Sequence, residues 1–410
     1  MSSSFTLPSF FPAPPGKERP DLLVIAGEHS GDQHVAVAVR DLSERDPGLT
    51  IAAMGGPALR ETNATFLCDL TESSVVGVFE VVRHFGYFRE LFARTLDWVE
   101  TWRPKNICFV DNPGFNLRLA EALYRRGLSR KAGGDIQLLY YISPQVWAWK
   151  KNRRFKMARH LDALAVIFPF ETESYADTDL PVSFVGHPFL SEAYDPFVRY
   201  DSEGSILLLP GSRRIAVGRI LPILLRGVCE LFKERPGETA TIITPDETIR
   251  AVVEREAAKW PELADKLELV DKADRVTGKA VLTSSGTMSL SCALAGVPGA
   301  IVYRANVLTF WLGKMLITIP YLGIANLLLN KPMYPEFLQD RATPANLVGE
   351  LKECLDSAER RESTRRDAAR LRELLSAPGT ETIGRWLARR IREADDICNP
   401  PGRGRRRDDN

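Results

Sequence analysis

A short apolar run that ends on an acid is the first stretch of this sequence that could do chemistry. Residues 108 to 117 are CFVDNPGFNL, so the run stops at Asp111 and is broken by Pro113 and Gly114. A carboxylate in this place either caps a helix that begins near Phe115 or takes a proton from a bound hydroxyl group. The run by itself leaves both functions open.

Two stretches farther along the chain have the residue types that bind phosphate. In LLLPGSRR, residues 207 to 214, Gly211 permits close backbone approach and Arg213 could form a fork on phosphate oxygens. In LTSSGTMSL, residues 282 to 290, a polar turn precedes a helix whose first amides and dipole favour an anion. The alternatives are a surface arginine on a turn and a serine that caps a buried helix. Together, on neighbouring strands, the two stretches favour a diphosphate site.

The elements that position these residues alternate between apolar strands and helices. Strand-like runs such as DLLVIAG, NICFVDN and IQLLYYIS are separated by helical stretches, which predicts a parallel, doubly wound sheet. The polar segment YDPFVRYDSEGS interrupts the alternation, which then restarts at ILLLPGSRR. The fold class is therefore α/β, with two Rossmann-like domains that face each other across a cleft, and a helical C-terminal region.

We predict five segments from this organisation. They are a flexible leader (1–20), a first Rossmann-like domain (21–195), a second Rossmann-like domain (205–345), C-terminal helices able to pack back on the first domain (346–396), and a disordered basic tail (397–410).

Composition narrows the classes of function. The chain has 410 residues, 44% of them hydrophobic and 26% charged, as in globular proteins of two domains. Its formal net charge of +1 gives no field for nucleic acid. Six scattered cysteines without a CxxC pair indicate reduced thiols and a cytoplasmic protein. Neither the Asp177–Asp179 pair nor the five histidines have the spacing of a metal site.

The motifs also resemble those of a known family when they are taken together and in order. The chain resembles the lipid-A-disaccharide synthases, which are inverting glycosyltransferases of the glycosyltransferase-B fold. The resemblance extends from about residue 21 to 350, and SPQVWAWK, LLPGSR and PEFLQ are the most specific stretches. The matching stretches are AGEHSGD (26–32), VVGVFEV (75–81), YYISPQVWAWKKNR (140–153), IFPFE (167–171), VGHP (185–188), LLPGSR (208–213), SSGT (284–287), YR with TFWLGK (303–314) and NLLLNKPMYPEFLQ (326–339).

The resemblance implies substrates, and a role for each domain and each group of residues. The first domain (21–195) would bind the acceptor and face a membrane, and the second (205–345) would bind the nucleotide. The donor would be UDP-2,3-diacylglucosamine and the acceptor 2,3-diacylglucosamine 1-phosphate, with neither a cofactor nor a metal. Asp111 matches the first acid of the family's D-x-P-D-F-N stretch, the presumed base, so the base function is favoured over the cap. The implied nucleotide-binding residues are Gly211, Ser212, Arg213, Ser285, Gly286, Thr287, Ser291, Tyr303, Asn326, Glu336 and Gln339. The implied acceptor and sugar residues are Glu28, Ser30, Gly31, Asp32, Asn116, Ser143, Trp147 and His187, the last of which is almost equally well explained as a structural histidine.

Three acids that the family carries are absent from this chain. Gly114 replaces the second acid after Asp111, Ala216 follows the PGSR turn where a glutamate is usual, and Ser291 stands where a glutamate would hold the ribose hydroxyls. Serine has a shorter reach and no charge, and one lost contact of this kind costs about 1–3 kcal/mol of binding. Two alternatives to the transferase follow: a non-catalytic relative that binds a UDP-sugar or a lipid, and a UDP-sugar 2-epimerase, which we rank last.

Acylated substrates imply contact with a bilayer. The stretch VFEVVRHFGYFRELF, residues 78 to 92, has apolar residues at helical spacing with basic residues beside them. Alone it would indicate a helix that faces the core, but the resemblance favours a helix at a membrane surface. We therefore expect a cytoplasmic protein that is peripheral on the inner membrane, and the amphipathic helices after residue 350 allow a homodimer without requiring one. The membrane residues would be Val78, Val81, Val82, Phe85 and Phe88.

Overall fold

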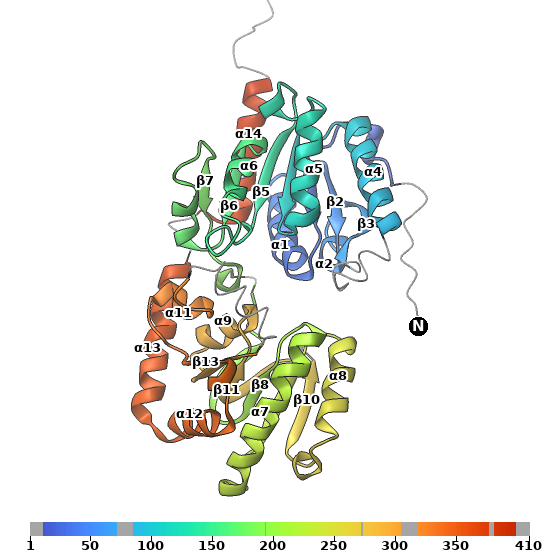
Figure 1. The fold of residues 1–410 in the computed structure, drawn as a ribbon. Coiled ribbons are helices and arrows are strands. Elements are labelled where there is room, and N and C mark those ends of the chain that lie inside the picture. The colour runs from blue at the N-terminus through green and yellow to red at the C-terminus, as the bar shows by residue number, and fades with distance from the viewer. Residues whose placement is uncertain are drawn as a thin grey trace, which may run out of the picture. The chain divides into compact units, whose positions relative to one another are not determined.

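The chain folds into two α/β units, each around its own parallel sheet (Figure 1). This computed structural model describes residues 11–71, 85–192, 194–271, 274–304, 319–376 and 381–398. The first unit comprises Met1–Pro188 and Ala377–Asn410, and the second comprises Phe189–Ser376. The first unit is therefore built from both ends of the chain.

The first unit has a sheet of seven strands in the order β3-β2-β1-β4-β5-β6-β7. All of its strand pairs are parallel. The strands are β1 (Leu22–Ala26), β2 (Ile51–Gly55), β3 (Thr65–Asp69), β4 (Asn106–Val110), β5 (Gln137–Tyr141), β6 (Ala163–Val166) and β7 (Val182–Phe184). Every residue of β1, β2, β4, β5 and β6 is buried, because helices cover both faces of the sheet.

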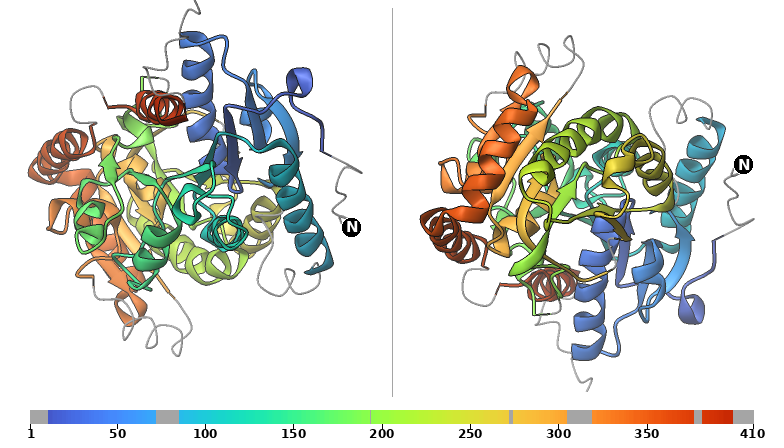
Figure 2. Two further views of the ribbon diagram at one scale, coloured as in Figure 1. Left: turned by 90° about the horizontal axis from the view of Figure 1, so that it is seen from above. Right: turned by 90° about the horizontal axis from the view of Figure 1, so that it is seen from below.

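Helices cover the two faces of this sheet in separate rows. The helices are α1 (His29–Arg45), α2 (Pro57–Arg60), α4 (Phe85–Trp102), α5 (Pro113–Arg125), α6 (Arg153–His160) and α14 (Ile383–Cys398). α4, α5 and α6 pack one beside the next, whereas α14 packs along α1 on the opposite face (Figure 2). Gly384 permits this close approach, because a Cβ atom there would lie 2.3 Å from the carboxylate of Asp41.

The second unit has a sheet of six parallel strands in the order β10-β9-β8-β11-β12-β13. The strands are β8 (Val198–Leu209), β9 (Ala240–Thr244), β10 (Leu267–Asp271), β11 (Val276–Thr283), β12 (Gly299–Tyr303) and β13 (Glu336–Leu338). The helices are α7 (Arg214–Glu234), α8 (Glu247–Ala257), α9 (Thr287–Leu294), α11 (Ile324–Leu329), α12 (Pro344–Asp356) and α13 (Ala358–Leu375). α7 packs on α8 and α12, and α9 packs on α11 and α13.

Each sheet has one point at which the strand order reverses. In the first unit the chain winds outward from β1 through β2 and β3 and then returns to β4 on the other side of β1. In the second unit it winds from β8 through β9 and β10 and returns to β11 beside β8. Ligands of doubly wound sheets bind outside the carboxyl ends of the strands at such reversals. The loops after β1 and β4, and those after β8 and β11, are therefore the places to look for a site.

The structure confirms the predicted class of two parallel α/β domains with a helical C-terminal region. The helices at the end of the chain divide between the units: α12 and α13 pack in the second, and only α14 returns to the first. Within the described ranges, no helix is long and apolar enough to cross a membrane.

Candidate active site

Asp111 lies at the reversal point of the first sheet, in an unusual backbone conformation. It follows β4 directly and has a φ of 45°, and the next residue, Asn112, has a φ of 42°. This left-handed region is costly for residues other than glycine, so a surrounding structure must hold the chain there. The Asp111 carbonyl accepts hydrogen bonds from the hydroxyl group of Tyr140 (2.6 Å) and from Nδ2 of Asn116 (2.8 Å). Its amide donates to the carbonyl of Tyr141 (3.0 Å).

The electrostatic surroundings of Asp111 suit a group that exchanges protons near neutrality. Its side chain is half-buried, and burial raises the pKa of the carboxyl to about 7. The negative charge of Glu28 contributes to this rise, and the Asn112 backbone amide, by hydrogen bonding, opposes it; the pKa of about 7 is the combined result. Glu28 follows β1, which pairs with β4, so both acids lie at the same edge of the sheet. A carboxyl with a pKa near the working pH is effective as a general base.

The described contacts do not support the capping alternative for Asp111. α5 has Asn112 as its N-cap residue, and no side chain forms a cap hydrogen bond there. The helix instead begins with Pro113, which fits the first turn because its missing amide proton has no intrahelical acceptor.

Asp32, one of the predicted acceptor residues, is occupied with a structural task. Its side chain is 1% exposed and accepts hydrogen bonds from the backbone amides of Gly56 (2.8 Å), Ala58 (2.9 Å) and Leu59 (3.2 Å). These three hydrogen bonds engage both oxygens of the Asp32 carboxylate and hold the start of α2 in place. The acid of the AGEHSGD motif that remains available at the strand edge is Glu28.

The other predicted residues of this loop differ in their surroundings. Gly31 is buried, and a Cβ atom there would lie 3.2 Å from Cγ1 of Val110, so glycine lets α1 approach β4 closely. Asn116 is fully buried and donates to the carbonyls of Val110 (3.1 Å) and Asp111. Ser30 is half-buried and follows Glu28 by two residues. Asn116 therefore shapes the base loop from inside rather than presenting itself to a ligand.

Ser143, Trp147 and His187 lie in an aromatic layer of the first unit. The Ser143 hydroxyl group is buried, 2.7 Å from the hydroxyl of Tyr175, and donates to the carbonyl of Pro144 (2.9 Å). The ring of the half-buried Trp147 makes an edge contact with Phe170, with 5.2 Å between ring centroids.

The surroundings of His187 favour its structural interpretation. It is 4% exposed, and its ring lies 5.3 Å from that of Phe168. Burial, assisted by the charge of His34, lowers the pKa of His187 to about 3, so the imidazole is neutral. A contact between His187 and the nucleotide sugar stays a prediction.

Two residues of this region were missed by sequence reasoning. Tyr140, whose hydroxyl group donates to the Asp111 carbonyl, belongs to the YYISPQ motif. We call this hydrogen bond the clamp on Asp111. Asp111 follows the neighbouring strand, and the sequence gives no sign that the two residues meet. Glu171 closes the IFPFE motif and is 2% exposed. Burial raises the pKa of Glu171 to about 8, although the Phe168 amide donates to its carboxylate (3.1 Å). A glutamate within an apolar motif was the available signal.

The two predicted phosphate-binding turns lie side by side in the second unit. β8 and β11 are neighbours, with Leu209 opposite Thr283, and the amide of Ser284 donates to the carbonyl of Leu209 (2.8 Å). Gly211 has a φ of 111°, and a Cβ atom there would lie 3.1 Å from Oγ of Ser284. Glycine is therefore required at this position both for its backbone angle and for its small size.

The groups on these turns are open to solvent. Ser212 and Arg213 are exposed, and among the described residues no carboxylate forms an ion pair with Arg213. Gly286 and Thr287 are exposed at the start of α9, which no side chain caps. Ser285 is half-buried just before them. A helix start with unsatisfied amides beside a guanidinium group is suited to bind a diphosphate.

Tyr303 and Gln339 lie at the same sheet edge as the turns. Tyr303 ends β12 and pairs with Leu338, the last residue of β13, and Gln339 follows with a φ of 51°. Both side chains are half-buried. The structure thus brings together the loops after four adjacent strands, β8, β11, β12 and β13.

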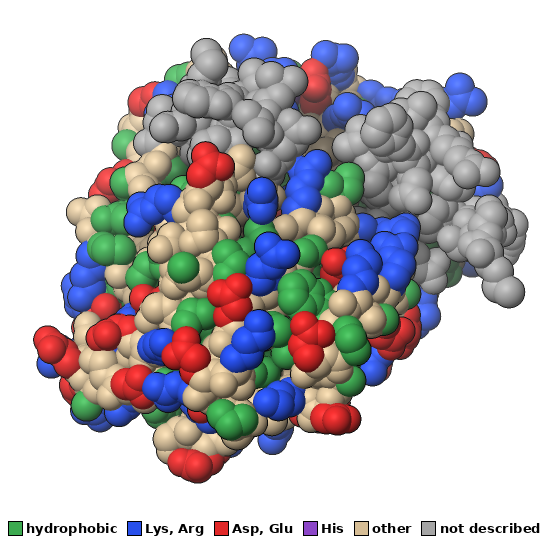
Figure 3. All heavy atoms as spheres, turned by 60° about the horizontal axis from the view of Figure 1, so that its bottom comes forward, with side chains coloured by type: hydrophobic (Ala, Val, Ile, Leu, Met, Phe, Trp, Pro, Cys, Tyr) green, Lys and Arg blue, Asp and Glu red, His purple; other side chains and the backbone are tan. Residues whose placement is uncertain are grey.

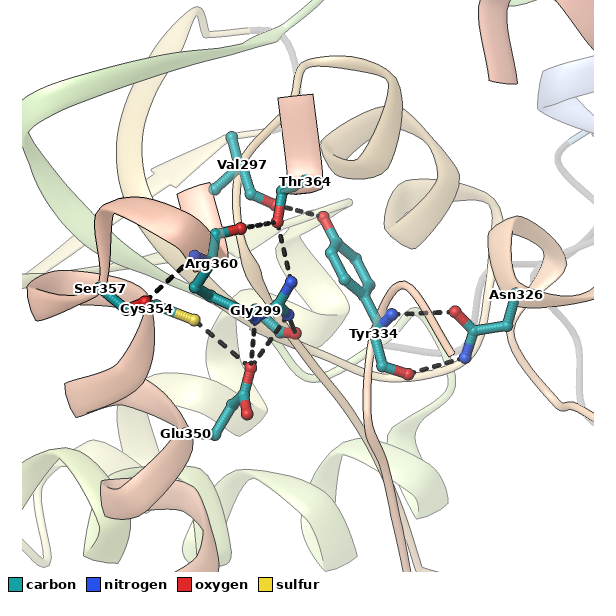
Figure 4. A network of polar contacts seen from close by, with 9 residues as sticks. All are labelled: Val297, Gly299, Asn326, Tyr334, Glu350, Cys354, Ser357, Arg360 and Thr364. Carbon is teal, nitrogen blue, oxygen red and sulfur yellow. Dashed lines mark hydrogen bonds and ion pairs between the residues drawn. The ribbon is translucent and has the colours of Figure 1, made fainter. Parts of the chain in front are cut away.

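Asn326 and Glu336, also predicted to bind nucleotide, form hydrogen bonds within the chain, and their contact with a nucleotide stays a prediction. Asn326 is fully buried, donates to the carbonyl of Tyr334 (2.7 Å) and accepts from its amide (2.9 Å), as Figure 4 shows. Glu336 accepts from Nδ2 of Asn326 and from the amides of Leu322 and Gly323, each at 3.0 Å. These contacts use Asn326 and most of the Glu336 carboxylate to shape a loop.

The same network extends to the C-terminal helices. Arg360 of α13 forms an ion pair with Glu350 of α12 (3.0 Å) and donates to the carbonyl of Gly299 (3.0 Å) at the start of β12 (Figure 4). The Tyr334 hydroxyl group donates to the carbonyl of Val297 (2.5 Å). This network fixes α13 and the loop around Tyr334 to the sheet.

The three positions that depart from the family pattern have different surroundings. Ser291 is 3% exposed, and its hydroxyl group lies 3.2 Å from that of Tyr194. Ala216 packs against the core of the second unit. Gly114 is exposed on the first turn of α5. Tyr194 is therefore a polar neighbour of Ser291, and a Cβ atom at Gly114 would lie 3.8 Å from Oδ1 of Asn112.

Within the ranges that the structure describes, no three His, Cys, Asp or Glu side chains lie close enough to hold a metal ion. Asp177 instead forms a two-pronged ion pair with Arg154, with distances of 2.7 and 2.5 Å. Asp179 pairs with Lys131 (3.4 Å).

The predicted membrane residues are only partly described. Val78, Val81 and Val82 lie outside the described residues, as does the side chain of Phe85. Phe88 is half-buried on α4, and its ring contacts that of Tyr87 edge-on, with 5.5 Å between centroids.

Solved structures with similar folds include nucleotide-sugar enzymes. A UDP-GlcNAc 2-epimerase from Neisseria meningitidis, bound to UDP-GlcNAc, matches with a TM-score of 0.58 and 10% identity, over 91% of this chain and 99% of that one. The calicheamicin glycosyltransferase matches with a TM-score of 0.53 and 14% identity, over 93% and 100% of the chains. At these identities the matches establish the fold alone, which is of the glycosyltransferase-B type.

Sequence comparison confirms the resemblance that the motifs indicated. The family model described as lipid-A-disaccharide synthetase matches residues 22–384. The lipid-A-disaccharide synthase of Geobacter metallireducens is 36% identical over 373 residues, which cover 87% of this chain and 94% of that protein. Lipid-A-disaccharide synthase 1 of Legionella pneumophila is 34% identical over 370 residues, or 87% and 93% of the two chains. Since these matches span both units, the chain belongs to the lipid-A-disaccharide synthase family.

Proposed function

We propose that this chain transfers 2,3-diacylglucosamine from UDP to 2,3-diacylglucosamine 1-phosphate, in the biosynthesis of lipid A. A hydroxyl oxygen of the acceptor attacks the anomeric carbon of the donor, its proton passes to Asp111, and the bond from that carbon to UDP breaks with inversion. The products are the tetraacyl disaccharide 1-phosphate and UDP. Family membership supports the overall reaction, and the observation that carries the mechanism is the position of Asp111 directly after β4, at the reversal point of the first sheet and beside the loop that holds Glu28.

The leaving UDP gains negative charge as the bond breaks, and we assign its stabilisation to the second unit. Arg213 and the open start of α9 at Gly286 and Thr287 would hold the diphosphate oxygens. Gly211 would allow the backbone to approach them. Tyr303, Gln339 and Ser291 remain candidates for the rest of the nucleotide, with Tyr194 added as the partner of Ser291.

The acylated substrates imply that the protein works at the inner membrane, as a peripheral protein on its cytoplasmic side. The stretch from residue 78 to 92 is the segment proposed to engage lipid, and Phe88 is the one of its five predicted membrane residues whose side chain the structure describes. A homodimer is compatible with the C-terminal helices and is not required by this function.

The deciding experiment supplies both acylated sugars to the purified chain and measures the product by mass spectrometry. A disaccharide together with UDP supports the proposal. Calorimetry with UDP is the companion measurement, because binding of UDP without any transfer would instead support a non-catalytic relative. The comparisons do not favour that alternative, nor the epimerase.

A further inference from the structure

A basic and aromatic surface lies on the first unit, apart from the groups assigned to catalysis. The stretch from Trp149 to Arg159 contains six Lys and Arg residues and no Asp or Glu. It consists of the turn that follows the SPQVWAW motif and most of α6. We call it the α6 surface. The residues of this surface that matter below are Trp149, Lys150, Lys151, Arg153, Arg154, Phe155 and Lys156.

Two large aromatic side chains of the α6 surface are directed to solvent. Trp149, in the turn before α6, is 44% exposed, and Phe155 on α6 is 47% exposed, whereas Met157 and Ala158 on that helix pack into the core. The other exposed large hydrophobic side chains among the described residues, Tyr200 and Ile215, both belong to the second unit. Exposed apolar groups that lie together and are surrounded by polar residues are typical of an interaction site.

The cations of this surface are interleaved with the rings. Nζ of Lys150 lies 4.4 Å from the centroid of the Trp149 ring, and Cζ of Arg153 lies 5.6 Å from the same ring. Cζ of Arg154 lies 4.3 Å from the ring of Phe155. A depression of about 520 Å³ beside them is lined by Lys150, Lys151, Asn152, Arg153 and Lys156. The charged and apolar groups therefore form one continuous surface.

Most of these cations lack an acidic partner. Across the described residues, Arg154 is the one member of the stretch that forms an ion pair, with Asp177. On α13, by contrast, Arg365 pairs with Glu362 and Arg370 with Glu373. On the face drawn in Figure 3, basic and acidic side chains are likewise interspersed. The α6 surface thus keeps an uncompensated positive charge.

We propose that the α6 surface docks on the anionic face of a lipid bilayer. Its cations would contact headgroup phosphates, and Trp149 and Phe155 would enter the boundary between headgroups and acyl chains, where aromatic side chains are favoured. The formal net charge of +1 for the whole chain disfavours nucleic acid as the partner. The inference rests on the proposed function insofar as acylated substrates bring the protein to a bilayer, but it concerns a surface other than residues 78 to 92.

Vesicle binding by the full chain tests the proposal independently of turnover. Vesicles of phosphatidylcholine are compared with vesicles that also contain phosphatidylglycerol, in a flotation assay at two salt concentrations. We expect binding to the anionic vesicles only, and weaker binding at higher salt. Each lost cation should weaken binding by about fivefold, so the variant K150Q/K151Q/K156Q should lose about 100-fold.

A second variant and a matched control separate the surface from general charge effects. W149A/F155A should also bind more weakly while all its cations remain. R365Q/R366Q/R370Q removes the same charge from exposed positions on α13 and should bind as the unchanged chain does. Circular dichroism checks that each variant is folded.

Three outcomes would overturn the proposal. In the first, K150Q/K151Q/K156Q still binds anionic vesicles as tightly as the unchanged chain does. In the second, the α13 control loses as much vesicle binding as that variant. In the third, that variant loses binding to a short RNA or to inorganic phosphate but keeps its binding to vesicles. Failure of the transferase assay on detergent-dispersed substrates would instead count against the proposed function. The two results are distinguishable because vesicle binding needs no turnover.

Discussion

The carboxyl edges of the two sheets hold the two candidate regions, and they are built in opposite ways. At the first sheet, Asp111 is half-buried, its backbone is held in a left-handed conformation, and the neighbouring strand β5 and helix α5 supply the hydrogen bonds. At the second sheet, Arg213, Gly286 and Thr287 are exposed, and no side chain caps the helix that begins there. Both regions occupy the point at which strand order reverses.

This difference fits the two kinds of chemistry proposed for these regions. A base must have its pKa set before the substrate arrives, so its surroundings are fixed and partly dry. Groups that bind a diphosphate must keep their donors available, so they stay solvated until the ligand replaces water. The first region is organised in advance, and the second is left open for its ligand.

Replacement of Asp111 by asparagine is expected to have the largest effect. Loss of the base should lower kcat by about 10²–10⁴-fold. UDP binding, measured by calorimetry, should be unchanged because the diphosphate groups belong to the other unit. D177N, which changes a surface acid paired with Arg154, is the matched control. A fall in kcat of less than tenfold in D111N would remove Asp111 from the role of base.

The change R213A tests the open region. Loss of charged hydrogen bonds to a diphosphate should weaken UDP binding by about 10- to 100-fold. R214A is the control, since Arg214 is adjacent, exposed and likewise free of an ion pair among the described residues. Equal weakening in both variants would indicate a general charge effect and not a specific contact.

The change Y140F tests whether the clamp on the Asp111 backbone matters for catalysis. It removes one of the two hydrogen bonds that the Asp111 carbonyl accepts, so kcat should fall by about 3- to 10-fold with little change in KM. Y141F, on the adjacent buried residue of the same strand, should leave kcat unchanged. Since a purely structural role would lower the melting temperature alone, the kinetics and the unfolding curve are measured together.

The smallest expected effect is a shift of the pH profile. Asp111 acts as a base only when ionised, so kcat/KM should rise as the pH passes through about 7 and then level off. The change E28Q removes a negative charge that raises the pKa of Asp111, and the profile should move to lower pH. The shift should be partial, because burial is the larger cause. A shift to higher pH would contradict this account of the acid pair.

Much of the fold could be predicted from the sequence, because apolar runs such as residues 22–26 and 106–110 alternate with helical stretches. The position of Asp111 at a strand end followed from the same pattern. Its left-handed backbone and its clamp could not be predicted, since Tyr140 comes from the next strand and their pairing depends on strand register. Asp32 looked like a ligand, yet its three amide donors lie 24 to 27 residues farther along the chain.

The motif residues of the second unit show a related limit. Asn326 and Glu336 belong to the segment that resembles the family, but the structure uses their polar groups to hold Tyr334 and the loop at Leu322. A sequence pattern marks such residues without telling whether they face a ligand or the chain itself. Whether such a side chain faces a ligand or the chain depends on which backbone groups lie near it, and the residue type alone does not show this.

The return of α14 to the first unit has a consequence for biosynthesis. Trp386, Leu387 and Ile391 of this helix are buried, and they are synthesised after the whole of the second unit. Because domains fold as units, the second unit can fold as soon as it has left the ribosome, whereas the first must wait with part of α1 uncovered until α14 has been made. The half that is made first is therefore the half that matures last, and during that interval it is the half that most needs a chaperone.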